Sequence, residues 1–212
     1  SLDGWGGPDR GHTSFTPLQQ AMAYTMSSFL TTGGIRGGKR KIGFYQARSF
    51  NMGLSRKAWL QTAGFQFDRL AEDIELSVRM RQLNLRVELI SDAFVYHKRR
   101  TSLKQFFFQV ANFGRGRVAV GAKHPGEVKW VHWFPAHFTM ALVVTLLSPL
   151  VTSLGFYLYA IGLFYLSLLF VDALRVTRSV QVAVLSIPSA LVQLTGYGTG
   201  FLAQKLKTLH NR

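Results

Sequence analysis

One uncharged stretch sets the strongest limit on what this sequence can fold into. The 42 residues from Trp130 to Val171 contain no Asp, Glu, Lys or Arg. As a helix they would extend about 63 Å, whereas the hydrocarbon core of a membrane is about 30 Å thick. A single core helix cannot account for that length. We therefore expect two membrane-spanning helices with a tight turn near residues 153–155, the alternative being a buried helical hairpin of a soluble protein.

A second uncharged run covers the 26 residues from Ser179 to Gln204. Pro188 interrupts it, and three glycines follow at 196, 198 and 200. The run predicts a third membrane helix kinked at Pro188, or else a re-entrant hairpin. The glycines would let a neighbouring helix approach closely. The three expected spans are about 132–152, 155–173 and 180–202.

The charged residues concentrate before these spans. Residues 1–131 hold 20 of the 25 basic residues and 9 of the 10 acidic ones. Arg175 and Arg178 lie between the second and third apolar runs. The positive-inside rule places both regions in the cytoplasm, in agreement with two passes between them.

The basic residues after the third run fit this topology less well. Lys205, Lys207 and Arg212 would also favour the cytoplasm, but three full passes would place them on the other side. The sequence leaves that conflict open.

Net charge and cysteine content exclude several other classes of protein. The formal charge of +15 is explained by basic residues beside a membrane, where anionic lipid attracts them. No nucleic-acid motif is present, so membrane lipid is the expected partner and nucleic acid is not. The absence of cysteine excludes disulfides, a cysteine-ligated zinc site and a cysteine nucleophile.

The first part of the chain alternates short helices and strands. Cap residues predict helices after Thr16, Ser55 and Ser102, the last through a Ser-x-x-Gln capping box. The aromatic helix that follows Ser102 has the profile of a helix in the membrane interface, or of one that packs in a core. The remaining expected elements are strands at 49–54, 86–90 and 93–96, and helices at 17–30, 56–63 and 72–83.

Two groups of residues in this part can carry chemistry. Glu72 and Asp73 open a predicted helix, where the helix dipole favours ionised carboxylates able to accept a proton from a hydroxyl. Ordinary capping is the alternative. His97 ends a predicted strand and can bind a metal ion as neutral imidazole, or can simply be packed. Lys98 and Arg99 follow it and can balance a diphosphate or meet lipid headgroups.

A basic, glycine-rich loop covers residues 33–41 and includes Arg36. Backbone N–H groups and cations in such a loop can hold phosphate, although a plain solvated loop has the same composition.

Taken in order, these pieces resemble the acceptor-side half and membrane tail of family 2 glycosyltransferases, the inverting GT-A type, and most closely the membrane-bound bacterial members. The resemblance covers nearly the whole chain and implies an α/β fold, a partial GT-A (Rossmann-like) domain followed by an all-α transmembrane tail. The expected divisions are the acceptor-side half at 1–101, an interfacial helix and linker at 102–131, and the transmembrane region at 132–212. The motifs that carry it are Asn51-Met52-Gly53, Gly64-Phe65, Glu72-Asp73-Ile74-Glu75-Leu76-Ser77, Asp92-Ala93-Phe94-Val95-Tyr96-His97 and the Phe-rich helix, with Thr31–Gly38 and Lys123–Gly126 as further similar stretches.

The resemblance implies a role for each matching residue. Asp73 matches the general base that deprotonates the acceptor hydroxyl, and Glu72 matches the residue that helps to orient acceptor or base. His97 matches the histidine that joins the metal ion, Mg²⁺ or Mn²⁺. The residues expected near the acceptor or the diphosphate are Asn51, Gly53, Arg36, Lys98, Arg99 and Gln109.

Two departures from the family pattern qualify these roles. Processive synthases carry Gln-x-x-Arg-Trp where this chain has Gln109, Asn112 and Phe113, so transfer of a single sugar is expected. No Asp-x-Asp metal motif is present, so the nucleotide-sugar donor is expected to bind an N-terminal half that this chain lacks, and the chain alone is expected to be inactive.

The resemblance implies transfer of a sugar, with inversion, to a lipid-linked or cell-envelope acceptor at the bacterial inner membrane, with the catalytic part cytoplasmic. Two alternatives remain: a processive polysaccharide synthase, and a non-catalytic membrane adaptor or scaffold that keeps a degenerate GT-A shape.

Overall fold

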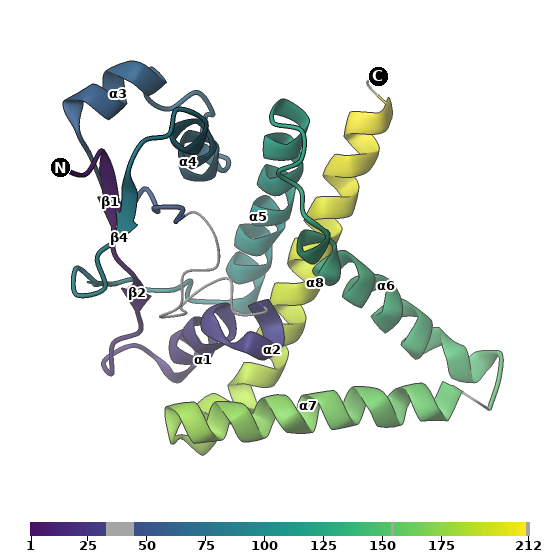
Figure 1. Cartoon of the computed structure of the whole chain (residues 1–212). Coiled ribbons are helices and arrows are strands. Elements are labelled where there is room, and N and C mark those ends of the chain that lie inside the picture. The colour runs from purple at the N-terminus through teal and green to yellow at the C-terminus, as the bar shows by residue number, and fades with distance from the viewer. Residues whose placement is uncertain (33–44, 154, 211–212) are drawn as a thin grey trace.

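The computed structural model describes residues 1–32, 45–153 and 155–210. Arg36 and the rest of the glycine-rich loop at 33–41 lie outside the described residues. A small part made of short strands and helices is followed by a long helical tail (Figure 1). The described chain is therefore mostly helical.

Two small sheets form the β structure of the described residues. In the first, β1 (Gly4–Gly6) lies between β3 (Met52–Leu54), which is antiparallel to it, and β4 (Val87–Leu89), which is parallel to it. In the second, β2 (Asp9–Arg10) pairs with β5 (Val95–Tyr96) in parallel. The expected strands are present but shorter, and the described residues do not form a doubly wound Rossmann-like sheet.

The helices of this part begin where the cap residues predicted. The Thr16 side chain accepts a hydrogen bond from the Gln19 backbone N–H, and the Ser55 side chain accepts one from that of Ala58. The helix expected at 17–30 divides at Ser28, whose backbone N–H still bonds the preceding turn while its ψ is extended. The helices are α1 (Pro17–Ser27), α2 (Phe29–Thr32), α3 (Arg56–Thr62) and α4 (Glu72–Gln82).

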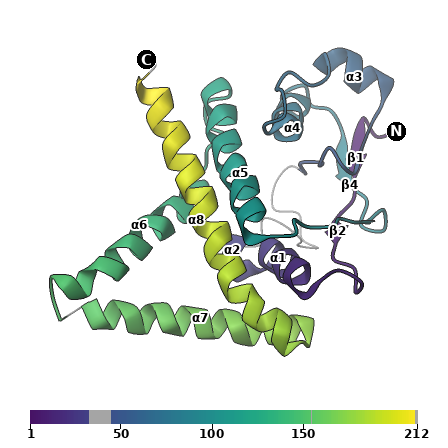
Figure 2. The ribbon, with the colours of Figure 1, turned by 180° about the vertical axis from the view of Figure 1, so that it is seen from behind.

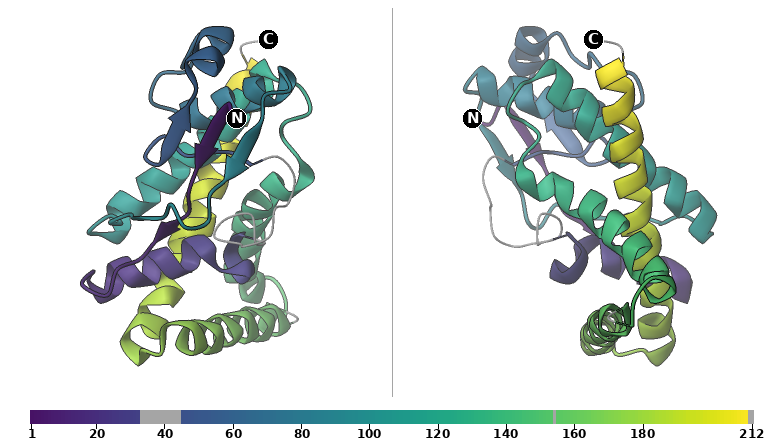
Figure 3. Two further views of the ribbon diagram at one scale, coloured as in Figure 1. Left: turned by 60° about the vertical axis from the view of Figure 1, so that its left-hand side comes forward. Right: turned by 90° about the vertical axis from the view of Figure 1, so that its right-hand side faces the viewer.

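Helix α5 (Leu103–Lys123) begins after Ser102, whose side chain accepts a hydrogen bond from the Gln105 backbone N–H at 3.3 Å. The reciprocal half of the predicted capping box differs. The Gln105 side-chain oxygen accepts from the backbone N–H of Thr101 at 3.3 Å, one residue earlier than the motif requires. The strands and α4 lie on the opposite side of α5 from α8 (Figures 1 and 3).

The tail contains three helical segments long and apolar enough to cross a membrane, as the uncharged runs predicted. The last of them runs unbroken through Pro188, so the alternative of a re-entrant hairpin is wrong. The elements are η1 (Trp130–Trp133), α6 (Phe134–Leu147), η2 (Ser148–Leu150), α7 (Gly155–Thr177) and α8 (Val180–His210).

Small residues bring α5 and α8 into close contact. A Cβ added at Gly200 would overlap the backbone carbonyl of Ala111, and one added at Gly196 would lie 2.6 Å from Cγ2 of Val110. On α5, a Cβ at Gly114 would overlap α8 in the same way. The predicted role of the α8 glycines is thus confirmed, because the two backbones lie too close for side chains at these positions.

Helices α6 and α7 form a hairpin whose two ends rest on α8. Near the start of α6, Ala136 packs against Phe201, and near the end of α7, Ala173 packs against Ala183. The turn between them lies far from α8 in both views (Figures 1 and 2). Most large apolar side chains of the hairpin are exposed, which suits a pair of helices surrounded by lipid.

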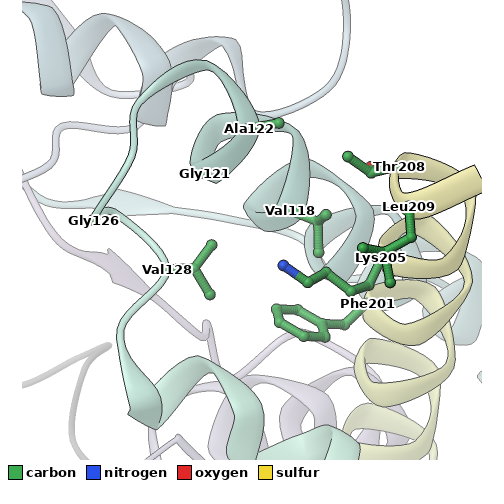
Figure 4. Close-up of a pocket in the computed structure, with 9 residues that line it drawn as sticks. All are labelled: Val118, Gly121, Ala122, Gly126, Val128, Phe201, Lys205, Thr208 and Leu209. Atoms are coloured by element: carbon green, nitrogen blue, oxygen red, sulfur yellow. The ribbon is translucent and has the colours of Figure 1, made fainter. Parts of the chain in front are cut away.

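The last turns of α8 lie beside the end of α5. Thr208 and Leu209 line a small cavity of about 210 Å³ together with Val118 of α5 (Figure 4). The Lys205 Nζ atom lies 5.9 Å from the ring centre of Trp133, at the start of the hairpin. The basic end of α8 thus lies on the side of the strands and α5. If α6 and α7 alone cross the membrane, the basic residues before α6, between α7 and α8, and at the end of α8 all lie on one side.

This arrangement is testable because the chain has no cysteine. In single-cysteine variants, Lys207→Cys should react with a membrane-impermeant maleimide from the same side as Lys57→Cys on exposed α3. Ser153→Cys, at the turn of the hairpin, should react from the opposite side. Labelling of sealed vesicles of both orientations gives the measurement. Reaction of Lys207→Cys together with Ser153→Cys would show that α8 is a third crossing.

The contact between α5 and α8 gives a second prediction. Gly200→Ala should lower the stability of the purified protein by about 1–3 kcal/mol, because the added methyl group forces the two backbones apart. Gly162→Ala on α7 is the matched control, since a Cβ there has no atom within 4 Å. Thermal unfolding in one detergent measures both. An equal melting temperature for the two variants would contradict the close packing.

Candidate functional site

A tight turn at residues 48–51 gathers residues that the sequence singled out at widely separated positions. The Asn51 backbone N–H donates to the Arg48 carbonyl at 2.8 Å and closes the turn. From this turn Ser49 contacts Glu72 and Asp73, the start of α4. Two other residues of the turn make further contacts: the Phe50 ring packs against His97, and the Asn51 side chain bonds to Ala93. Segments near positions 51, 73 and 97 therefore meet at one place.

Asp73 lies in the first turn of α4, as predicted. Its side chain is 14 % exposed, and its Oδ2 atom lies 3.8 Å from Arg48 Nη1 and 3.4 Å from the backbone N of Ser49. The other oxygen, Oδ1, accepts the Ile74 backbone N–H at 2.8 Å. The residue before the helix, Ala71, offers no side-chain cap. Helix N–H groups and the guanidinium thus balance a carboxylate that still reaches solvent.

Glu72 lies beside it and contacts the same turn. Its Oε1 atom accepts a hydrogen bond from the Ser49 hydroxyl at 3.4 Å. Two adjacent carboxylates therefore share Ser49, one through its hydroxyl and one through its backbone N–H.

His97 directly follows β5, and its backbone N–H donates to the Arg10 carbonyl at 3.1 Å. Its ring lies edge-on to Phe50, with 4.3 Å between ring centres. Within residues 1–32, 45–153 and 155–210, no three His, Asp or Glu side chains form a cluster able to hold a metal ion. A Mg²⁺ or Mn²⁺ site that includes His97 would therefore need further ligands from outside the described residues, and no chemical step is assigned to a metal.

Asn51 and Gly53 have clear structural roles. The Asn51 side-chain amide donates to the Ala93 carbonyl at 2.8 Å and ties the turn to the strand that leads to His97. Gly53 lies opposite Trp5 in the sheet, where any Cβ would overlap the indole ring.

The remaining predicted site residues lie apart from this turn. Arg99 is buried and forms an ion pair with Asp9, and its carbonyl accepts the Gln19 side-chain amide at 2.8 Å. Lys98 is exposed. Gln109 lies on α5, with a buried Oε1 atom that has no hydrogen-bond partner among the described residues.

A buried ion network next to Asp73 was not predicted from the sequence. Glu75 is 0 % exposed and accepts hydrogen bonds from Arg79 Nη2 at 2.7 Å, Lys123 Nζ at 2.9 Å and His124 Nε2 at 3.0 Å. Burial alone would raise the pKa of Glu75, but these donors outweigh it and lower the pKa to about 2. The four-residue spacing of Glu75 and Arg79 within one helix was the available signal.

This network joins three segments. Arg79 also donates to the Gly64 carbonyl at 2.7 Å, after α3, while Lys123 and His124 belong to the end of α5. Glu75 thus fixes the first turn of α4, two residues after Asp73, against its neighbours.

Removal of this buried charge gives a third prediction. Glu75→Gln should destabilise the protein by about 3 kcal/mol, because three donors lose their charged partner. In the unmodified protein the contribution of Glu75 is complete above pH 4.5, its ordinary pKa, and is lost as the pH falls towards 2. Unfolding by denaturant across this pH range measures both effects.

The control is Glu88→Gln, which removes a carboxylate paired with Arg86 at the surface. It should change stability by less than about 1 kcal/mol. Equal losses in the two variants, or a Glu75→Gln variant with the full acid sensitivity of the unmodified protein, would contradict the role of the network.

In comparisons with protein families, with curated proteins and with solved structures, nothing matches this chain.

Proposed function

We propose that this chain is the acceptor-side part of a membrane-bound family 2 glycosyltransferase. It would transfer one sugar, with inversion, from a nucleotide-sugar to a lipid-linked or cell-envelope acceptor. The observation that supports this most is the 48–51 turn, which joins the segments of Asn51, Asp73 and His97. Such convergence is what a shared site requires.

Asp73 is the proposed general base. Its carboxylate reaches solvent at the start of α4, with Oδ2 3.8 Å from Arg48 Nη1 and Oδ1 accepting the Ile74 backbone N–H. An acceptor hydroxyl bound against it would pass its proton to a carboxylate oxygen as the hydroxyl oxygen attacks the anomeric carbon. The bond to the nucleotide breaks, and the nucleotide leaves with the electron pair. Attack from the face opposite the leaving group inverts the configuration.

The membrane tail supports an acceptor held in or near lipid. The α6–α7 hairpin exposes its apolar side chains, the end of α7 packs near Tyr24 of the part that carries Asp73, and the start of α6 packs near α5 and α8. Basic residues on that side favour the cytoplasmic face, in our proposal of a bacterial inner membrane. Mg²⁺ or Mn²⁺ and the nucleotide-sugar belong to the proposal as groups held mainly by residues outside the described part, because the described residues form no metal-binding cluster.

The lack of a metal-binding cluster among the described residues favours a second candidate, a non-catalytic membrane adaptor or scaffold of similar shape. A scaffold would need neither a base nor a donor site. Asp73 and Glu72 would then serve only as capping residues of α4.

The general base is tested by Asp73→Asn in the full-length protein. Membranes are incubated with radiolabelled nucleotide-sugars, and the label is measured in the lipid extract and in polymer. Transfer should fall by about 100-fold or more, because the amide cannot take the proton. Label confined to small lipid-linked products would support single transfer over processive synthesis.

Asp68→Asn is the matched control, since that carboxylate is 93 % exposed in the segment just before α4. It should transfer at the unmodified rate, and both variants should melt at similar temperatures. Undiminished transfer by Asp73→Asn would remove the base assignment. No transfer by the unmodified protein from any donor, with folding intact, would favour the scaffold.

A further inference from the structure

A pocket lies between the segment after β2, helix α1 and the last turn of α7, beyond the 48–51 turn and His97. Its volume is about 450 Å³. The charged and polar side chains of its wall include Asp9, Arg10, His12, Arg99 and Thr177. Neither Glu72 nor Asp73 contributes to it, so it is distinct from the site proposed above.

Arg99 is the best placed of these side chains to bind an anion. Its side chain is only 7 % exposed and pairs with Asp9 through Nη2. Its Nε–H is buried and has no hydrogen-bond partner among the described residues. A guanidinium offers five donors in one plane, and a buried donor without a partner is costly. Arg99 therefore has donors to spare beyond its contact with Asp9.

The charge on the pocket wall also favours an anion. Arg10 and Arg99 face one carboxylate, Asp9, so the balance of these three is positive. Lys98 and Arg100 flank Arg99 and are exposed. The Arg10 guanidinium lies 3.8 Å from the ring centre of Phe94, and this contact holds it in place at the surface.

The position of the pocket indicates which anion it would meet. Val176 and Thr177 end helix α7, between Arg175 and Arg178, where the apolar span gives way to charge. With α6 and α7 as the crossing pair, this end lies at the membrane surface. Phospholipid headgroups occupy that depth, and their phosphates bind arginine through charge-assisted hydrogen bonds.

A contact between α1 and α7, the two helices that line the pocket, holds them together near the end of α7. The Tyr24 hydroxyl donates to Asp172 Oδ2 at 2.5 Å, and Ser28 donates to the same oxygen at 3.4 Å. Burial and this carboxylate raise the pKa of Tyr24, so the phenol keeps the proton that it donates.

We propose that this pocket binds the headgroup phosphate of an anionic membrane phospholipid, with Arg99 and Arg10 as its donors. The pocket is larger than a single phosphate needs, and Ala23, Met26 and Val176 give it an apolar wall for the glycerol part. The site would anchor the α/β part to the membrane surface whether or not the chain transfers sugar.

The test compares three Arg→Gln variants of the full chain, purified in detergent with added phosphatidylglycerol. Bound lipid is counted by native mass spectrometry. Arg99→Gln and Arg10→Gln should each retain about tenfold less phosphatidylglycerol than the unmodified protein. Arg86→Gln, whose side chain is 64 % exposed on the sheet, should retain the unmodified amount. Arg10 is exposed, so its variant tests the site even if the buried Arg99 variant does not fold.

Two further arms separate the source of the phosphate. Phosphatidylcholine in place of phosphatidylglycerol should bind less, and excess inorganic phosphate should displace little lipid. The proposal is overturned if Arg10→Gln retains as much phosphatidylglycerol as Arg86→Gln. It is also overturned if the two lipids bind equally. Displacement of most of the bound phosphatidylglycerol by excess inorganic phosphate would overturn it as well, because it would indicate a site for free phosphate.

Discussion

The close contact between α5 and α8 determines how the rest of the molecule is arranged. Gly196 and Gly200 let α8 lie directly against the backbone of α5. Because α8 also carries both ends of the α6–α7 hairpin, its position fixes where the chain enters and leaves the apolar region. Because Val120 of α5 packs with Ile74 and Val78 of α4, the same contact connects the membrane part with the α/β part.

From α5 the connection continues to the candidate site through one buried carboxylate. Lys123 and His124, at the end of α5, both contact Glu75. Glu75 lies in the first turns of α4, which present Asp73 to the 48–51 turn. Hydrogen bonds from three donors to one buried carboxylate restrict the position of α4 relative to α5 more tightly than apolar packing does. The position of Asp73 relative to the membrane helices therefore follows from contacts that do not include Asp73 itself.

The sequence predicted local structure well because each signal acts within a few residues. Thr16, Ser55 and Ser102 all begin helices, and both uncharged runs form long apolar helices. Contacts between segments far apart in the sequence were harder to predict. The sequence suggested a role for Glu72 and Asp73 and placed them at a helix start, but nothing in it showed that Ser49 and Arg48 would contact them. Whether Asp73 and His97 perform the expected chemistry remains a prediction.

The way the α6–α7 hairpin is attached has a mechanical consequence. Among the described residues, the hairpin contacts α8 through the first half of α6 and the second half of α7, whereas the part near its turn is largely exposed. The tilt of such a hairpin is set by the thickness of the surrounding bilayer, because little protein contact opposes a change of angle. In a thinner membrane the hairpin would lean over about its attachment to α8, while α5 and the strands keep their arrangement. Lipid thickness would thus alter the height of the α/β part above the bilayer without altering its internal structure.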